Sequence, residues 1–146
     1  MLKKLQVYSE YPAINKRAVH SLISALRLEF NLNISFLSIS FINSTELRAV
    51  NEKYLNHDFN TDVITFNYSK RVKEIDGEIL ISFEEARRNA KKYNTKYSKE
   101  ISRLIIHGVL HLLNYDDNNK KNKANMKQME NKLINRYNFT LLVGKQ

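Results

Sequence analysis

The sequence predicts an α+β protein in which about four strands form a sheet and about five helices pack on it. Segments with strand-like alternation and segments with helical spacing of apolar residues follow one another along the whole chain. Two of the strand segments are separated by only a short polar turn, which favours an antiparallel hairpin. The length of 146 residues suits one domain with its own core, so we expect residues 1–146 to form a single domain.

The first half of the chain alternates between strands and helices. The expected elements are a strand over residues 4–9, a helix over 14–31, a strand over 34–43 and a helix over 44–56. The strand segments are rich in β-branched and aromatic residues with period-two alternation. The first helix places Leu22, Leu26 and Phe30 on one face, and Ser44 is the expected N-cap of the second.

The second half contains the expected hairpin and three helices. We expect a strand over residues 61–69, a polar turn that ends at Gly77, a strand from there, and helices over 84–94, 99–113 and 120–139. Ser98 is the expected N-cap of the middle helix, and Asn114 is expected to end it because asparagine tolerates the left-handed conformation. The last helix turns Met126, Met129, Leu133 and Tyr137 inward.

The composition restricts the classes of function. The chain has no cysteine, so thiol chemistry is excluded and any metal site has to be built from His, Asp and Glu. The net charge of +9 favours a polyanionic partner such as RNA, although a basic surface can also serve solubility alone. Because no apolar run could cross a bilayer and no signal peptide is evident, we expect a cytoplasmic protein with no membrane partner.

The histidine pair in RLIIHGVLHLLNYDDNN is the strongest candidate for a functional site. His107 and His111 are four residues apart on a helix, which puts their Cβ atoms about 5–6 Å apart on one face. Two imidazoles at that spacing can share one tetrahedral ion, and partial burial in this apolar helix favours their neutral form. The alternative is that two core histidines only hydrogen-bond buried carbonyls. Gly108 stands where a zinc protease carries its general-base glutamate, so a protease is not expected.

The turn after this helix supplies carboxylates. Beyond Asn114 the chain can fold back so that Asp116 or Asp117 closes a coordination sphere over the helix end, with one position left open for water. The alternative is that both aspartates are ordinary turn formers whose charge caps the next helix.

Three stretches between Leu47 and Asp117 match, in order, the motifs of one family. HGVLHLLNYDD is similar to His-Gly-x-Leu-His-Leu-x-Gly-Tyr-Asp-His, LRAVNEKYLNHDFNTDVITF to Leu-Asn-x-x-Tyr-Arg-x-x-Asp-x-Pro-Thr-Asp-Val-Leu-Ser-Phe, and GEILIS to Gly-Asp-Ile-x-Ile-Ser. The chain therefore resembles the YbeY family of bacterial rRNA-maturation endoribonucleases. The resemblance implies a mixed sheet, a central histidine helix and a cleft at a metal that admits single-stranded RNA.

The match departs from the family pattern at two positions. The family's third metal-binding histidine falls on Asp117, and two histidines with one carboxylate are themselves an accepted catalytic zinc set. The family's arginine falls on Leu55, which removes a clamp for phosphate. His57 nearby is then the candidate general acid or base or phosphate contact, unless it is an exposed loop histidine without a role.

Further residues are expected to support the site. Asp116 matches the family's aspartate beside the third ligand and is expected to orient a histidine. Thr61 and Asp62 match the family's Thr-Asp pair, and the alternative is that they satisfy local amides at a strand end. The basic residues expected to bind the RNA backbone are Arg71, Lys73, Arg87 and Arg88.

The expected function is that of a zinc-dependent, single-strand-specific endoribonuclease in rRNA maturation and in ribosome assembly and quality control. One Zn²⁺ per chain would be held by His107, His111 and Asp117, and catalysis would depend on both histidines and His57. The expected partners are precursor ribosomal RNA and the small ribosomal subunit, with no nucleotide cofactor. The alternatives are a non-catalytic, RNA-binding assembly factor with a structural metal, and a metal-dependent hydrolase of another substrate.

Overall fold

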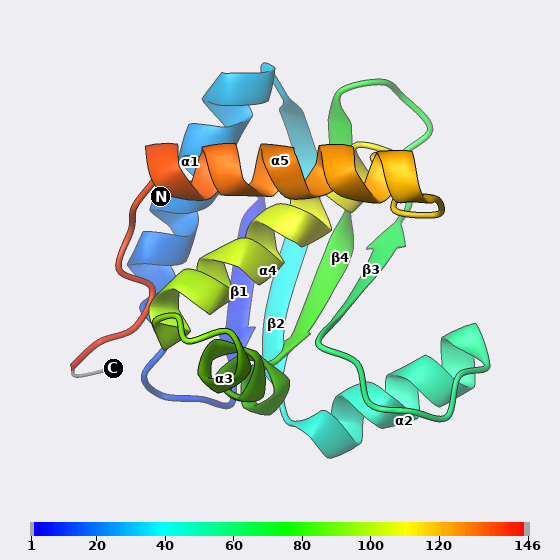
Figure 1. The fold of residues 1–146 in the computed structure, drawn as a ribbon. Coiled ribbons are helices and arrows are strands. Elements are labelled where there is room, and N and C mark those ends of the chain that lie inside the picture. The colour runs from blue at the N-terminus through cyan, green and yellow to red at the C-terminus, as the bar shows by residue number, and fades with distance from the viewer. Residues whose placement is uncertain (1, 145–146) are drawn as a thin grey trace.

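The computed structural model describes residues 2–144 of the chain. Within that range the elements are β1 (Leu5–Ser9), α1 (Lys16–Phe30), β2 (Asn33–Ile42), α2 (Ser44–Leu55), β3 (Val63–Asn67), β4 (Glu74–Ser82), α3 (Phe83–Lys92), α4 (Tyr97–Leu112) and α5 (Lys120–Arg136) (Figure 1). The α+β class and the order of the expected elements are confirmed. None of these helices is long and apolar enough to cross a membrane.

The strands form one mixed sheet in the order β1-β2-β4-β3. β1 pairs with β2 and β2 with β4 in parallel, whereas β3 pairs with β4 antiparallel, which confirms the hairpin. The register aligns Val7 with Ile39 and Ile39 with Ile79, all three of them buried. Because side chains alternate between the faces of a strand, this alignment gives the sheet one continuous apolar face.

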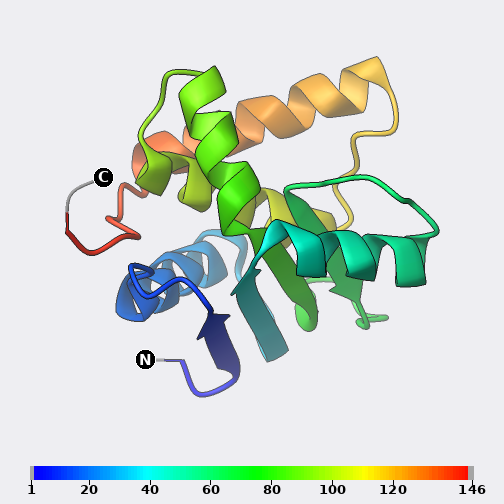
Figure 2. The same cartoon turned by 90° about the horizontal axis from the view of Figure 1, so that it is seen from below.

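The helix that carries the histidines lies across that apolar face. Figure 1 shows α4 crossing in front of the sheet, with α5 above it and α3 below. Figure 2, seen from below, places α3 and α5 on the same side of the strands. α4 packs on β3 and β4 and also against both flanking helices. The central position of the histidine helix is therefore confirmed.

Two helix starts differ from the expectation. Asn43, not Ser44, caps α2, because its side-chain oxygen accepts a hydrogen bond from the Glu46 amide. α4 begins at Tyr97, so Ser98 lies inside its first turn. The Ser98 hydroxyl instead accepts a hydrogen bond from the Leu141 amide at 2.8 Å, which ties the C-terminal segment to α4.

The expected turn between the hairpin strands is shorter than predicted. β4 begins at Glu74, so Gly77 lies inside the strand and does not end the turn. A Cβ atom on Gly77 would collide with the carbonyl oxygen of Phe66 and would lie 3.0 Å from the Leu112 side chain. The glycine is therefore required by the close approach of β3 and α4, which the local sequence does not reveal.

Candidate metal centre

The end of α4 determines where the chain goes after the histidines. Asn114 has a φ of 70°, the left-handed conformation predicted for it. Its amide donates to the carbonyl oxygen of His111 at 2.9 Å, and the Tyr115 amide donates to that of Leu110 at 3.0 Å. These bonds satisfy carbonyls that would otherwise lack partners at the helix end and reverse the chain direction. Asp117 thereby returns over the last turn of the helix.

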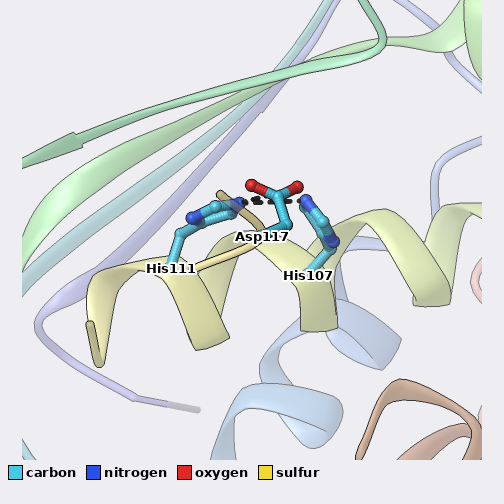
Figure 3. A group of neighbouring side chains, drawn as sticks. All are labelled: His107, His111 and Asp117. Atoms are coloured by element: carbon cyan, nitrogen blue, oxygen red, sulfur yellow. Dashed lines mark hydrogen bonds and ion pairs between the residues drawn. The ribbon is translucent and has the colours of Figure 1, made fainter. Parts of the chain in front are cut away.

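Figure 3 shows His107 and His111 rising from α4 with the carboxylate of Asp117 facing their rings. The two Nε2 atoms lie 3.1 Å apart, and the ring centroids are 4.6 Å apart. An oxygen of Asp117 lies 3.9 Å from Nε2 of His111. One ligand atom from each of the three residues lies within 4.8 Å of the other two.

This group fits a divalent cation. Two imidazole nitrogens bound tetrahedrally to zinc at about 2.0–2.1 Å would lie about 3.3 Å apart, close to the separation of the two Nε2 atoms. The carboxylate adds a negative charge on the open side, where the Asp117 side chain is 42% exposed. The donor set is that of sites which accept zinc and similar ions.

The surroundings of His111 favour its neutral, ligating form, and within the described part of the chain neither histidine ring is bound to a backbone carbonyl. Burial lowers the pKa of His111, and the neighbouring His107 lowers it further. The ring of His107 contacts the carboxylate of Glu130, and no hydrogen bond joins either ring to a backbone carbonyl among the described residues. The alternative of two histidines that only satisfy buried carbonyls therefore does not describe this pair.

Two cavities meet at His107. The smaller, about 270 Å³, is lined by His107 and His111 together with residues of α2, β3 and the loop between them. That loop contributes His57 and Thr61, and α2 contributes Leu55, whose exposed side chain stands where the resemblance expects an arginine. The His57 ring stacks on Phe59 at 5.1 Å between centroids. The fold thus brings these separate sequence segments to the histidine pair.

The larger cavity, about 460 Å³, lies between α4 and α5 and is also lined by Asp117. Its wall contains Lys99, Lys123 and Lys127, none of which forms an ion pair with another described residue. The wall of this cavity therefore carries three positive charges, next to the histidine pair, that could bind an anionic ligand.

The expected RNA-binding residues lie elsewhere. Arg71 and Lys73 line a separate cavity near the end of α4, and the Lys73 ammonium donates to the carbonyl oxygen of Phe30 at 3.1 Å. On α3, Arg87 stacks on Tyr97 with 5.1 Å to the ring centroid, and Arg88 pairs with Glu85. None of these four cations lines a cavity that includes His107.

The supporting acids are arranged differently from the expectation. Asp116 accepts hydrogen bonds from the amide of Asn118 at 3.3 Å and the side chain of Asn122 at 2.7 Å, so it shapes the loop that carries Asp117. Asp62 accepts from Asn89 at 3.0 Å and lies 3.9 Å from the guanidinium of Arg103. It therefore belongs to a charged network behind the histidines.

Sequence reasoning missed the centre of that network. Arg103 on α4 binds Glu100 through two nitrogens, at 2.6 and 2.8 Å, and Glu130 of α5 at 3.3 Å. Glu130 also contacts His107 at 2.5 Å. The available signal was that Glu130 shares the buried face of the last helix with Met126, Leu133 and Ile134, where a carboxylate needs a partner.

The fold and the site together define a small α+β protein in which two histidines and a carboxylate form a candidate metal site next to two cavities. The family model described as "Endoribonuclease YbeY" matches residues 3–138. The chain belongs to this YbeY endoribonuclease family, whose members are hydrolases that act on RNA.

Several relatives carry the same description. An "Endoribonuclease YbeY" of Azobacteroides pseudotrichonymphae is 35% identical over 126 residues, which are 86% of this chain and 90% of the relative. One from Parabacteroides distasonis is 36% identical over 125 residues, 86% and 87% of the two chains. A solution structure of a Thermotoga maritima protein covers 91% of this chain and 88% of its own, with a TM-score of 0.64 at 22% identity. That last similarity concerns the fold.

Proposed function

We propose that this chain is a metal-dependent endoribonuclease that cuts single-stranded RNA during the maturation of ribosomal RNA. The observation that carries the proposal is the group of His107, His111 and Asp117 at the junction of two cavities. Relatives that match most of the chain are named as endoribonucleases, and the +9 charge suits a polyanionic substrate. We place its action in the cytoplasm, on precursor rRNA in the small ribosomal subunit.

The three residues would hold one divalent cation per chain. We propose zinc, because two imidazoles with one carboxylate and an open position form an established catalytic zinc set. When bound, such an ion supplies a Lewis acid that lowers the pKa of water and polarises a phosphoryl oxygen. Both partly buried rings would bind through a nitrogen lone pair, burial lowers the pKa of His111 and so favours this, and the more exposed Asp117 would supply the negative charge of the site.

We assign His57 to proton transfer or to contact with the scissile phosphate. Its support is that His57 lines the same cavity as His107 and His111, at the side formed by the loop after α2. The stacking on Phe59 limits the orientations of the ring. A His57→Ala variant that cleaves RNA at the wild-type rate would remove this residue from the mechanism.

We expect the phosphates nearest the scissile bond to contact Lys99, Lys123 and Lys127, because these cations line the cavity that Asp117 shares. More distant parts of a longer RNA would then contact the four cations expected from the sequence, which are Arg71, Lys73, Arg87 and Arg88. For single-stranded nucleic acid, each phosphate contact contributes about −0.7 to the slope of log K against log salt concentration, so removing one contact makes the slope less steep by about 0.7. For a short RNA, Lys123→Gln and Lys127→Gln should each make the slope less steep by that amount, and Arg71→Gln should leave the slope unchanged.

The proposal is tested by metal content and RNA cleavage measured on the same samples. We expect about one zinc per chain by plasma mass spectrometry in the wild type, with strong losses of both metal and cleavage in His111→Ala and Asp117→Ala. Asp76→Asn is the matched control, since Asp76 is a carboxylate of β4 outside both cavities. Absence of metal after zinc is supplied, or full cleavage by the two site variants, contradicts the proposal.

One observation favours a second candidate, a non-catalytic factor in ribosome assembly with a structural metal. Leu55 is 42% exposed in the cavity of the histidines, where an arginine would hold a phosphate. For that candidate, removing the metal lowers the melting temperature, and the intact protein binds RNA without hydrolysis. Cleavage by the wild type separates the two: a nuclease cuts RNA without any substitution, whereas a factor that is inactive for lack of the clamp shows no cleavage until Leu55→Arg supplies it.

A further inference from the structure

Glu130 makes contacts that a purely structural carboxylate would not need. Its side chain is only 6% exposed, although it lies on α5 and the histidines lie on α4. One oxygen lies 2.5 Å from Nδ1 of His107, and the other lies 3.3 Å from Arg103. The carboxylate therefore joins the half-buried guanidinium of Arg103 to the back of the His107 ring, whose front faces the candidate metal site.

The donor and acceptor pattern fixes the protonation of the His107 ring. An ionised carboxylate can only accept hydrogen bonds, so the short contact requires the proton on Nδ1. In a neutral ring the lone pair is then on Nε2, which is the nitrogen 3.1 Å from Nε2 of His111. Without Glu130 both tautomers would be available, and one of them turns an N–H toward the position of the cation.

We propose that Glu130 is a positioning residue of the metal centre, which holds His107 in the Nδ1–H tautomer with its Nε2 lone pair directed at the ion. This inference rests on the proposed metal-dependent function and adds a residue of α5 to the site. Carboxylates behind metal-binding histidines act this way in other proteins, where they fix the ring and raise its basicity.

Arg103 keeps this arrangement in place. Its guanidinium binds Glu100 through two nitrogens and also reaches Glu130, so the buried carboxylate retains a compensating positive charge. The hydrogen bonds and charge of Glu100 raise the pKa of Arg103. The sequence of contacts thus runs from Glu100 through Arg103 and Glu130 to His107.

Glu100 offers a matched control within this network. Both glutamates are buried, with side chains 2% and 6% exposed, and both bind the Arg103 guanidinium. Only Glu130 contacts a histidine among the described residues. If both glutamates serve folding alone, substituting either one should have a similar effect on zinc affinity. If Glu130 positions His107, substituting Glu130 should lower zinc affinity much more than substituting Glu100.

The experiment compares Glu130→Gln with Glu100→Gln in the full chain. Zinc affinity is measured by competition with a chromophoric chelator, and stability is measured by urea unfolding of the metal-free proteins. We expect Glu130→Gln to lower zinc affinity by about 10–100-fold, the range for partners behind a metal ligand, and Glu100→Gln to change it much less. Glu130→Asp, which keeps the charge but withdraws the carboxylate, should lie between wild type and Glu130→Gln.

A second measurement reports on the tautomer without any metal. Nitrogen-15 NMR of the metal-free wild type should show the His107 proton on Nδ1, and Glu130→Gln should shift the ring toward a mixture. Wild-type zinc affinity in Glu130→Gln, equal losses in both variants, or an unchanged tautomer would overturn the inference. If the wild type binds no zinc, the proposed function fails, and the tautomer measurement still decides the role of Glu130.

Discussion

Gly108 separates the two histidines, and its replacement by alanine tests how tightly α4 packs on the sheet. A Cβ atom built on Gly108 would lie 2.8, 2.9 and 3.2 Å from three carbons of Ile79. Ile79 is fully buried at the middle of β4, which is paired with a strand on each side. Ordinary carbon contacts begin near 3.5 Å, so the helix would have to retreat by about 0.7 Å.

Two opposing terms give the expected magnitude. Alanine in place of glycine favours a helix interior by about 1 kcal/mol. Overpacking a filled core costs about 1–3 kcal/mol, and the upper end applies because the β-branched Ile79 side chain cannot rotate away in a fully buried position. We therefore expect Gly108→Ala to lower the free energy of unfolding by about 2 kcal/mol and the melting temperature by about 4–8 °C.

The assay is urea unfolding, in which the midpoint should fall while the slope m stays constant. The control is the same substitution in an Ile79→Ala background, where all three close contacts are gone. There the helix propensity acts alone, so Gly108→Ala should stabilise by up to about 1 kcal/mol. A raised midpoint in the wild-type background, or an equal loss in both backgrounds, refutes the packing argument.

Three further results are expected. Asp117→His, which restores a third imidazole, should keep or increase zinc affinity; a loss as large as that of Asp117→Ala would exclude this position as a ligand. Asn51→Ala removes the 3.1 Å hydrogen bond from the buried Asn51 side chain to the Phe59 carbonyl; it should lower stability by about 1–3 kcal/mol and speed proteolysis of the loop after α2, and unchanged stability and proteolysis would contradict this. Burial lowers the pKa of His20, so its contribution to stability is present above about pH 6.5 and declines as the pH falls through the folded-state pKa. His20→Gln should flatten the pH dependence of urea unfolding between pH 7.5 and 5, and an unchanged profile would contradict this.

Local physical chemistry made much of the fold predictable from the sequence. Apolar residues repeat with period two in the strands and about 3.6 in the helices, because each element buries one face. The hairpin followed from the short polar turn, and the end of α4 followed from the tolerance of Asn114 for the left-handed conformation. His107 and His111 were predictable as a pair, since four residues of helix necessarily place them on one face.

The features of the fold that the sequence did not predict depend on contacts between segments that are distant in the chain. The order β1-β2-β4-β3 is set by which apolar faces pack together, and no local pattern specifies it. The requirement for glycine at position 77 arises where α4 and β3 approach β4. The same packing separates Arg71, Lys73, Arg87 and Arg88 from the cavities at His107, although all four lie on or beside elements that the sequence predicted.

The candidate metal site shows most clearly which features the sequence determined and which the tertiary structure decided. The sequence by itself determined the two histidines and a returning aspartate, because a helix and the turn that ends it are fixed by neighbouring residues. Only the tertiary structure brought Glu130 to His107 and placed Leu55 and His57 in the same cavity. Those residues meet because α5 packs against α4 while α2 packs against β4 and α3, and such packing is decided by the shapes of whole apolar faces and not by any short stretch of sequence.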